Sequence, residues 1–459
     1  MPTPERANSR RGLLSSVSSG RALLVLSCIL FGFTVTGATK EGAALAWGLG
    51  DNNQSTVPVL AHESVIAISG GADHSLALKT DGTVMAWGSD RYGQASVPTE
   101  IQGRIRAIAS GWAHSVALTD TGSVVVWGDN GWGQADVPVE AMSGVRSIAA
   151  GTHCVLAVRD DGSVIAWGSN HGGETSVPAT ARQGVVSVAA GYAHALALKA
   201  DGSLLAWGLN MWGVAEVPTD GRSGIVSIAA GHEHNVVLRI DGTVIAWGSN
   251  YEGESMVPDS IQGSVTGIAA GTYHSLALTK NGAVVGWGRS SFGVTNVPSA
   301  AITNCLAVGS GMEHGLAIVR PSQPEITRPP ASATVQEWRN ISLTAQAVGY
   351  PLNYRWQKDG ASISGATNWS LHLVLAQTNQ AGSYSVVIHN SVGSATSSPP
   401  AVVPVAPAAS SDGPDSVLAW GFDPTRRTAV PVEARRRVRA IAARSLTSMA
   451  LTDDGKVIV

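Results

Sequence analysis

The sequence has little charge, few cysteines and no sustained helical period, and each shortage excludes a class of protein. Asp, Glu, Lys and Arg make up 14 % of the 459 residues and leave a net charge of −3, which excludes nucleic-acid binding driven by a bulk positive surface. Three cysteines are too few for a disulfide framework. Because no 3.6-residue period persists, helical repeats are excluded as well.

Catalytic motifs are also missing. The chain contains no Gly-x-Ser-x-Gly nucleophile turn, no His-Glu-x-x-His zinc motif and no phosphate-binding glycine loop. We therefore predict no catalytic residues, no metal site and no cofactor.

What the sequence does have is apolar content and glycine. Hydrophobic residues make up 44 % of the chain, which also contains 53 glycines. This composition is typical of a folded, turn-rich β protein rather than of a disordered chain. At roughly 150 residues per domain, the length predicts about three domains.

Residues 1–38 are predicted to be an export signal. Four arginines and one acid precede the uncharged, mostly apolar run of residues 22–38, which ends in small residues suited to cleavage. We expect a secreted or cell-envelope protein, and the alternative is an uncleaved anchor. Outside this segment only Cys154 and Cys305 remain, and we expect both to be buried and unpaired.

A 40-residue repeat organises most of the chain. Trp-Gly pairs, Val-Pro pairs and single glycines recur at this spacing without insertions. The repeated residues are Trp47, Trp87, Trp127, Trp167, Trp207, Trp247 and Trp287; Pro58, Pro98, Pro138, Pro178, Pro218, Pro258 and Pro298; and Gly71, Gly111, Gly151, Gly191, Gly231, Gly271 and Gly311. A regular period of this length indicates a solenoid or a propeller.

Each repeat predicts three to four short strands. Partly alternating, β-branched runs flank a two-residue hairpin turn such as Asp161-Gly162, and Val-Pro is expected to end a weak outer strand. The repeats begin with a lone Ala-Trp-Gly strand and end with a lone hairpin at residues 305–319, so the first strand can complete the last blade. We predict an all-β chain with a seven-bladed β-propeller over residues 44–319.

The repeat resembles a known superfamily. The run VSVAAGYAHALALKADGSLLAWGLN, at residues 186–210, is similar to the regulator-of-chromosome-condensation repeat. The 40-residue period and the recurring Val-Pro resemble its secreted bacterial branch, the β-lactamase-inhibitor propeller, more than the nuclear exchange factor, whose repeats are longer. The resemblance implies a propeller in a bacterial protein, with inhibition of a secreted enzyme as one function.

Residues 320–404 are predicted to form a linker and an immunoglobulin-like β-sandwich. Trp356 lies where the core tryptophan of such a sandwich belongs, and Tyr384 resembles its tyrosine corner. The usual disulfide positions fall near Ala345 and Val386, so apolar packing must replace the bridge.

Residues 405–459 are predicted to contain a linker and a degenerate partial propeller repeat. The motif SVLAWG ends at Gly421, but Arg444 and Thr447 replace the Gly and His of the usual Gly-x-x-His. We expect a truncated second propeller. The alternatives are an eighth blade or a unit that displaces residues 44–48.

The regularly spaced residues are expected to build the scaffold. Each repeated Trp should be buried, with a gross contribution of roughly 5 kcal/mol. Six histidines share the period: His74, His114, His194, His234, His274 and His314. They lie too far apart to converge on a metal, so each is expected to bond within its own blade. Cys154 stands at the seventh such position.

Positions that vary between repeats are candidates for recognition. Two loop positions are rich in large aromatic residues: the fifth residue after the repeated Trp, and the residue after the Gly of Gly-x-x-His. They give the partner-binding candidates Tyr92, Trp112, Trp132, Tyr192, Trp212 and Phe292. Aromatic rings on rigid loops make binding hot spots, and the alternative is that they only cap their own blades.

The predicted function is therefore that of an exported, non-catalytic binding protein whose propeller loops recognise a protein partner. Cell-envelope attachment is compatible with this function, whereas a nucleic-acid partner is not expected. The alternatives are a carbohydrate-binding or carbohydrate-active propeller that uses the same rings, and an inhibitor of a secreted enzyme such as a β-lactamase.

Overall fold

The computed structural model describes residues 41–406, 438–444, 447–452 and 457–458, and within them the fold is all β apart from short 3₁₀ helices. The predicted signal and Trp420 lie outside the described residues. In the described part of the chain, no helix is long and apolar enough to cross a membrane.

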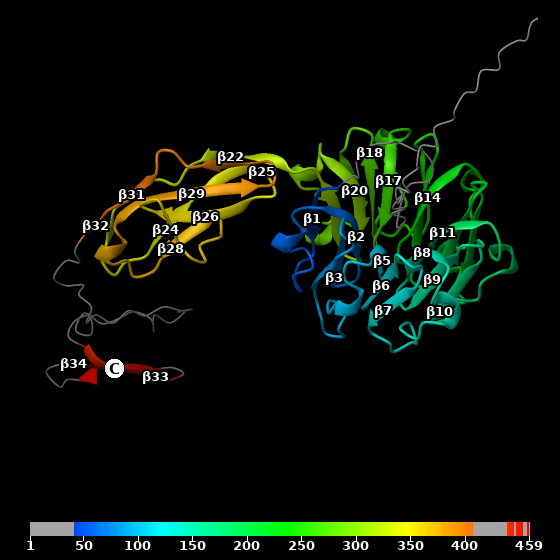
Figure 1. The fold of residues 1–459 in the computed structure, drawn as a ribbon, viewed down its shortest axis with the longest axis horizontal. Helices are drawn as coiled ribbons and strands as arrows, with labels where there is room; N and C mark the ends of the chain where they lie inside the picture. The colour runs from blue at the N-terminus through cyan, green and yellow to red at the C-terminus, as the bar shows by residue number, and fades with distance from the viewer. Residues whose placement is uncertain (1–40, 407–437, 445–446, 453–456, 459) are drawn as a thin grey trace, which may run out of the picture.

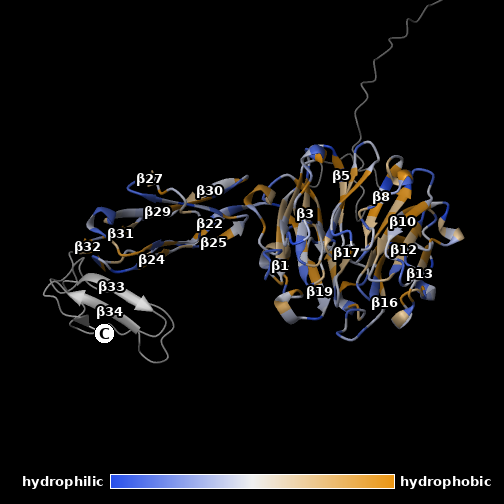
Figure 2. Ribbon diagram, turned by 90° about the horizontal axis from the view of Figure 1, so that it is seen from below, coloured by the Kyte–Doolittle hydropathy of each residue, from blue (hydrophilic) through white to orange (hydrophobic). Residues whose placement is uncertain are grey.

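Seven three-stranded antiparallel sheets follow one another around a common axis (Figure 1). They are β2 (Val65–Gly70), β3 (His74–Lys79) and β4 (Val84–Gly88); β5 (Ile105–Ser110), β6 (His114–Thr119) and β7 (Val124–Gly128); β8 (Val145–Ala150), β9 (Cys154–Arg159) and β10 (Val164–Gly168); β11 (Val185–Ala190), β12 (His194–Lys199) and β13 (Leu204–Gly208); β14 (Ile225–Ala230), β15 (His234–Arg239) and β16 (Val244–Gly248); β17 (Val265–Ala270), β18 (His274–Thr279) and β19 (Val284–Gly288); and β20 (Cys305–Ser310), β21 (His314–Val319) and β1 (Ala43–Gly48). Apolar side chains fill the space between neighbouring sheets, and orange stretches recur along the propeller strands in Figure 2.

The first strand closes the circle of sheets. β1 pairs with β21 from Ala43↔Val319 to Gly48↔His314. A ring of backbone hydrogen bonds also joins the ends of the inner strands. Its members, each an N–H donating to a carbonyl, are Ala72 to Trp112, Trp112 to Thr152, Thr152 to Gly191, Tyr192 to His232, His232 to Gly271, Thr272 to Met312 and Met312 to Gly71. The last bond returns to the first sheet.

The repeated tryptophans connect neighbouring sheets. All seven are buried, as predicted. Each indole Nε1 donates to a backbone carbonyl in the loop that leaves the preceding sheet. The pairs are Trp47 with Val294, Trp87 with Gln54, Trp127 with Gln94, Trp167 with Gln134, Trp207 with Glu174, Trp247 with Val214 and Trp287 with Glu254, at 2.6–3.1 Å. The Trp47 bond joins the first strand of the chain to the loop that leaves the sixth sheet, so it helps to close the ring.

Five of the six repeated histidines bond across sheets, so the expectation that each bonds within its own blade was wrong. Nε2 of His74 lies 3.0 Å from Oγ of Ser115 in the next sheet, and Nε2 of His314 lies 2.8 Å from Oγ of Ser75. The ring lies against the glycine of its own Gly-x-x-His turn, where a Cβ on Gly71 would meet it at 2.2 Å. The imidazole ring therefore reaches beyond its own sheet to the side chain of the next one. Among the described residues, no three His, Cys, Asp or Glu side chains gather as metal ligands.

The Val-Pro pairs do not end an outer strand. The proline instead caps a short 3₁₀ helix, because its fixed φ suits a helical start and its missing N–H is not needed there. These helices are η1 (Val59–Ala61), η2 (Thr99–Ile101), η3 (Val139–Ala141), η4 (Ala179–Ala181), η6 (Thr219–Gly221), η7 (Asp259–Ile261) and η9 (Ser299–Ala301). Each described blade consequently has three strands.

A second β module follows the propeller. Its strands are β22 (Ser322–Arg328), β23 (Val335–Gln336), β24 (Ile341–Thr344), β25 (Gln346–Tyr350), β26 (Asn353–Lys358), β27 (Ala361–Ser362), β28 (Ser370–Leu373), β29 (Gly382–Asn390), β30 (Gly393–Thr396), β31 (Ala401–Val403) and β32 (Val405–Ala406), with one 3₁₀ helix, η10 (Thr378–Gln380). The largest sheet runs β27-β26-β29-β30, and β31 also pairs with β29. Trp356 and Tyr384 are buried in the core of this module.

The second module contacts the closing sheet of the propeller (Figure 1). The Tyr350 hydroxyl donates to the carbonyl of Ala44 in β1, and Nδ1 of His62 lies 3.3 Å from Oδ1 of Asn353. The module thus holds the strand that closes the ring.

The last described strands form a sheet of their own: β33 (Val438–Arg444), β34 (Thr447–Thr452) and β35 (Val457–Ile458). The register shift after Val438 matches the shift after Val65 in the propeller. Because β1 stays paired with β21, this unit does not displace residues 44–48, and that alternative was wrong.

Candidate binding face

One end of the propeller carries the loops that contain the two aromatic positions, and we call it the aromatic face. It consists of the loops after the outer strands and the turns of the Gly-x-x-His motifs: residues 49–56, 89–96, 129–136, 169–176, 209–216, 249–256 and 289–296, and residues 71–73, 111–113, 151–153, 191–193, 231–233, 271–273 and 311–313. The opposite end, which we call the turn end, carries the Asp-Gly hairpin turns and the 3₁₀ helices.

All six predicted partner-binding residues lie on the aromatic face and are exposed. Their exposed fractions run from 39 % to 52 %, for Tyr92, Trp112, Trp132, Tyr192, Trp212 and Phe292. Exposed apolar side chains that gather into a patch mark interaction sites more often than single ones do. The sequence predicted the positions but did not establish that both kinds of loop share a face.

Ring contacts join the two kinds of loop. The His153 ring lies 5.5 Å from Trp112, which belongs to a Gly-x-x-His turn, and 5.6 Å from Trp132, which belongs to a loop after an outer strand. Trp132 also meets His171 edge-on at 4.7 Å. These rings therefore form one continuous cluster.

A second set of ring contacts lies further round the same face. Tyr192 stacks on His232 at 4.4 Å with an interplanar angle of 20°, and Trp212 meets Tyr251 edge-on at 5.0 Å. Tyr251 is 74 % exposed. The sequence did not single out Tyr251 because it does not occupy either recurring aromatic position, although it directly precedes one of them.

A buried amide or carboxylate holds most of the variable loops. Its side-chain oxygen accepts the backbone N–H of the residue two positions earlier, as from Tyr92 to Gln94 and from Trp132 to Gln134, both at 2.8 Å. The same bond occurs at Gln54, Glu174 and Glu254. The loops are thus fixed from below while their aromatic rings stay exposed.

Two loops lack this residue and adopt another conformation. Val214 and Val294 occupy the position and are buried. Trp212 and Phe292 then lie in the short helices η5 (Met211–Gly213) and η8 (Ser291–Gly293) with φ of 62°. Left-handed φ is costly for a residue with a Cβ, and such strain tends to persist at functional sites.

Burial keeps several ionisable groups of this face neutral. It lowers the pKa of His153, against the opposing effect of Asp129 and Glu174. Burial also raises the pKa of the Cys154 thiol to about 12, so this cysteine is not a reactive nucleophile. Cys305 is likewise buried, and both cysteines are unpaired, as predicted.

The axis of the propeller contains a cavity of about 200 Å³. Small and apolar residues of the inner strands line it, with Trp112, His232 and Met312 at the aromatic end, and no Asp, Glu, Lys or Arg side chain contributes. The chemistry available to a partner therefore lies around the cavity mouth.

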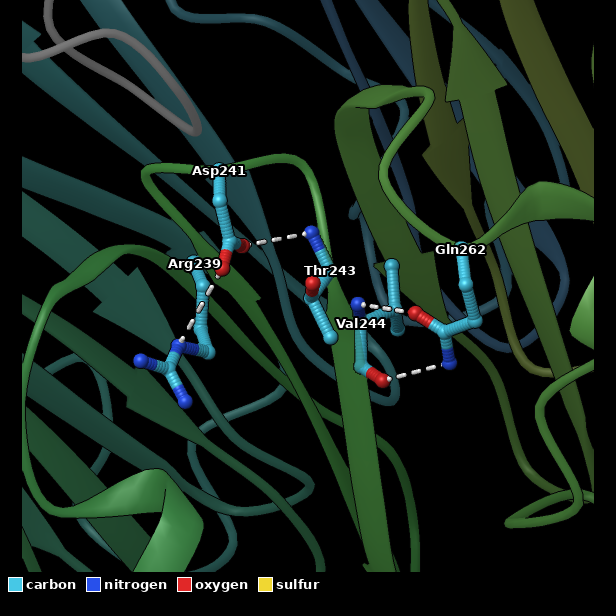
Figure 3. A network of polar contacts seen from close by, with 5 residues as sticks. All are labelled: Arg239, Asp241, Thr243, Val244 and Gln262. Carbon is cyan, nitrogen blue, oxygen red and sulfur yellow. Dashed lines mark hydrogen bonds and ion pairs between the residues drawn. The ribbon is translucent and has the colours of Figure 1, made fainter.

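At the turn end, polar side chains bond the protein's own backbone and one another (Figure 3). Oδ1 of Asp241 accepts the N–H of Thr243 at 2.9 Å, and its Oδ2 lies 3.9 Å from Nε of Arg239. Gln262 bonds both backbone groups of Val244, at 2.9 and 3.0 Å. The Asp-Gly glycines have positive φ, as predicted.

Comparison of the sequence with known families identifies the repeat. Five segments match the model of the regulator of chromosome condensation (RCC1) repeat: residues 65–94, 105–134, 185–210, 225–254 and 265–294. These repeats make an RCC1-type repeat propeller. The repeat that carries Cys154 in place of His is not among the matched segments.

Solved RCC1-type propellers share the fold. Prp20p from Saccharomyces cerevisiae, studied for its binding to Gsp1p and histones, is 20 % identical with a TM-score of 0.50, over 61 % of this chain and 92 % of that chain. Yeast RCC1 (Prp20) in complex with Kap60 is 19 % identical with a TM-score of 0.50, over 62 % and 90 %. No curated protein matches the sequence.

Proposed function

We propose that the protein is an exported, non-catalytic binding protein that recognises a protein partner on the aromatic face of its propeller. The observation that carries this proposal is the set of six exposed rings on one end of a rigid closed scaffold. Prp20p, which shares the fold, binds Gsp1p and histones, so protein binding is a known use of such propellers. The charged start and apolar run of residues 1–38 support export.

We further propose that the second module is an immunoglobulin-like sandwich that acts as a spacer. Trp356 is fully buried and its Nε1 donates to the Asn368 carbonyl at 2.9 Å. The Tyr384 hydroxyl donates to the Gln380 carbonyl at 2.6 Å, as in a tyrosine corner. Buried Ala345 and Val386 lie in the same core, where packing takes the place of a disulfide.

Affinity capture from the secreted and envelope fractions of the host tests the binding role. The full chain serves as bait beside a variant with Trp112, Trp132, Tyr192 and Trp212 changed to Ala. A matched variant changes Val59, Leu60, Val139 and Ile240, exposed apolar residues of the turn end, to Ala. We expect one partner to be captured by the wild type and by the turn-end variant and lost with the aromatic variant. Equal capture by all three would contradict the proposal.

Sugar recognition is the second candidate, because exposed Trp rings also stack on carbohydrate. A glycan array with the same three proteins separates the two functions: glycan binding that disappears only with the aromatic variant would favour a lectin. Inhibition of a secreted β-lactamase is a narrower form of the protein-binding proposal, tested by adding the purified protein to the enzyme.

A further inference from the structure

The two ends of the propeller differ in charge. The surface of the aromatic face has nine carboxylates and two guanidinium groups: Asp51, Asp73, Asp90, Asp129, Asp136, Glu216, Glu233, Glu252 and Glu313, with Arg91 and Arg289. The turn end is almost balanced, with twelve carboxylates and eleven cationic groups: Glu41, Glu63, Asp81, Glu100, Asp120, Glu140, Asp160, Asp161, Asp201, Asp220, Asp241 and Asp259, with Lys79, Arg104, Arg106, Arg146, Arg159, Arg182, Lys199, Arg222, Arg239, Lys280 and Arg320. The excess of negative charge is thus confined to the end where the rings are exposed.

The two arginines of the aromatic face are already engaged by its rings. Arg289 lies over Tyr273 at 5.4 Å and over Phe292 at 5.7 Å, and Arg91 lies over Tyr92 at 5.7 Å. In the described part of the chain, these guanidinium–ring contacts all occur on this face. The rings are therefore placed so that a cation can approach them from the solvent side.

Several carboxylates of the face have no partner of their own. Among the described residues, the side chains of Asp51, Asp73 and Glu252 make no hydrogen bond or ion pair. By contrast, the aspartates of the hairpin turns are used by the scaffold, as Asp241 illustrates (Figure 3). The carboxylates of Asp51, Asp73 and Glu252 are therefore available to a ligand, and they lie at the end of the propeller that has the excess of negative charge.

Resting on the proposed protein-binding role, we infer that the aromatic face binds a lysine- or arginine-rich segment of its polypeptide partner. The carboxylates provide charge complementarity and steer the partner toward the face. The exposed rings pack against the alkyl stems of Lys and Arg and hold their cationic groups. An acidic segment would meet repulsion from the same carboxylates.

Fluorescence anisotropy with labelled peptides tests the inference directly. The probes are short peptides of alternating Arg and Gly, of Lys and Gly, and of Glu and Gly. One variant of the full chain neutralises the unpartnered acids of the face: Asp51→Asn, Asp73→Asn and Glu252→Gln. The matched control neutralises three exposed acids of the turn end, Glu100→Gln, Glu140→Gln and Asp259→Asn, so both variants have the same net charge.

We expect the cationic peptides to bind the wild type and the control, and to bind the aromatic-face variant about tenfold more weakly, with affinity falling as salt rises. No binding of the cationic peptides, equal weakening in both variants, or equal binding of the Glu peptide would overturn the inference. Capture of a protein partner that is lost with the Trp and Tyr variant, but unaffected by the neutralised variant, would overturn it and leave the proposed function standing.

Discussion

His114 shows what a single exception in the repeat costs. In the described structure, the other repeated histidines each have a side-chain partner for Nε2, but both ring nitrogens of His114 lack one. The reason is that Val155 occupies the position at which Ser115 meets His74. A buried polar group without a partner costs about 1–3 kcal/mol.

Supplying the missing hydroxyl should stabilise the propeller relative to a variant that lacks both the hydroxyl and the methyl groups of Val155. We expect Val155→Ser to raise the free energy of unfolding about 1–2 kcal/mol above that of Val155→Ala, which removes the same methyl groups without adding a hydroxyl. Denaturant titration measures the difference. Ala195→Ser is the matched control, since Cys154 rather than His stands one sheet earlier. An equal gain at both sites would mean that the histidine is not involved.

Residues that recur were predictable, but their partners were not. The period alone identified the buried Trp set and the scaffold role of the histidines. It did not reveal that His74 bonds Ser115, because the partner lies one residue beyond the next copy of the motif. Similarly, His153 and His171 were missed because the aromatic positions were compared only with their own copies in other repeats.

The variable loops, as elements, show an internal pairing rule. In three loops the buried residue that holds the loop also bonds the side chain of the residue five positions earlier: Gln134 with Asp129, Glu174 with Ser169, and Glu254 with Ser249. Nε2 of Gln134 donates to Asp129 at 2.7 Å, whereas Glu254 accepts from the Ser249 hydroxyl at 2.6 Å. Where Leu49 offers no acceptor, Nε2 of Gln54 remains unpaired.

Breaking this rule should be costly and repairing it should restore stability. Gln134→Glu places a carboxylate against Asp129 in a buried site, so we expect the free energy of unfolding to fall by about 1–3 kcal/mol. The pair Asp129→Ser with Gln134→Glu reproduces the arrangement of Ser249 and Glu254 and should recover most of the loss. A double-mutant cycle measures the coupling, and additive effects would refute the pairing.

The two strained loops make a different prediction. At Trp212, where φ is 62°, we expect Trp212→Gly to be about 1 kcal/mol more stable than Trp212→Ala, since only glycine adopts this φ without cost. Trp132 does not have positive φ, so there we expect Trp132→Ala to be more stable than Trp132→Gly. Thermal unfolding of the four variants measures the difference in stability between Gly and Ala at each site. If the Gly variant were the more stable one at both sites, or the less stable one at both, strain at Trp212 would be refuted.

At the scale of the whole molecule, the sequence predicted the repeat, its strands and the role of the first strand. It left the number of strands per blade at three or four, because Val-Pro suits a strand end and a 3₁₀ start equally well. Nor could it place the second module against the closing strand. That contact depends on Tyr350 and Ala44, which lie far apart in the sequence.

The buried histidines make the stability of the propeller depend on pH. Burial is the main cause that lowers the pKa of His74 and His274 to about 3 and that of His114, His194, His234 and His314 to about 4, from 6.5. The unfolded chain therefore binds protons that the native state does not. The contribution of each histidine to stability is full above pH 6.5 and is lost as the pH falls from 6.5 toward its native pKa, about 4 for four of them and about 3 for His74 and His274.

Replacing one of these groups should flatten this dependence. We expect His274→Gln to lower the free energy of unfolding at pH 7.5, because it disturbs the bond to Ser310, but to lose less stability than the wild type between pH 6.5 and 5.5. Parallel curves for the wild type and His274→Gln would show that acid sensitivity arises elsewhere. The five histidines that bond across sheets would then tie the sheets together without sensing pH.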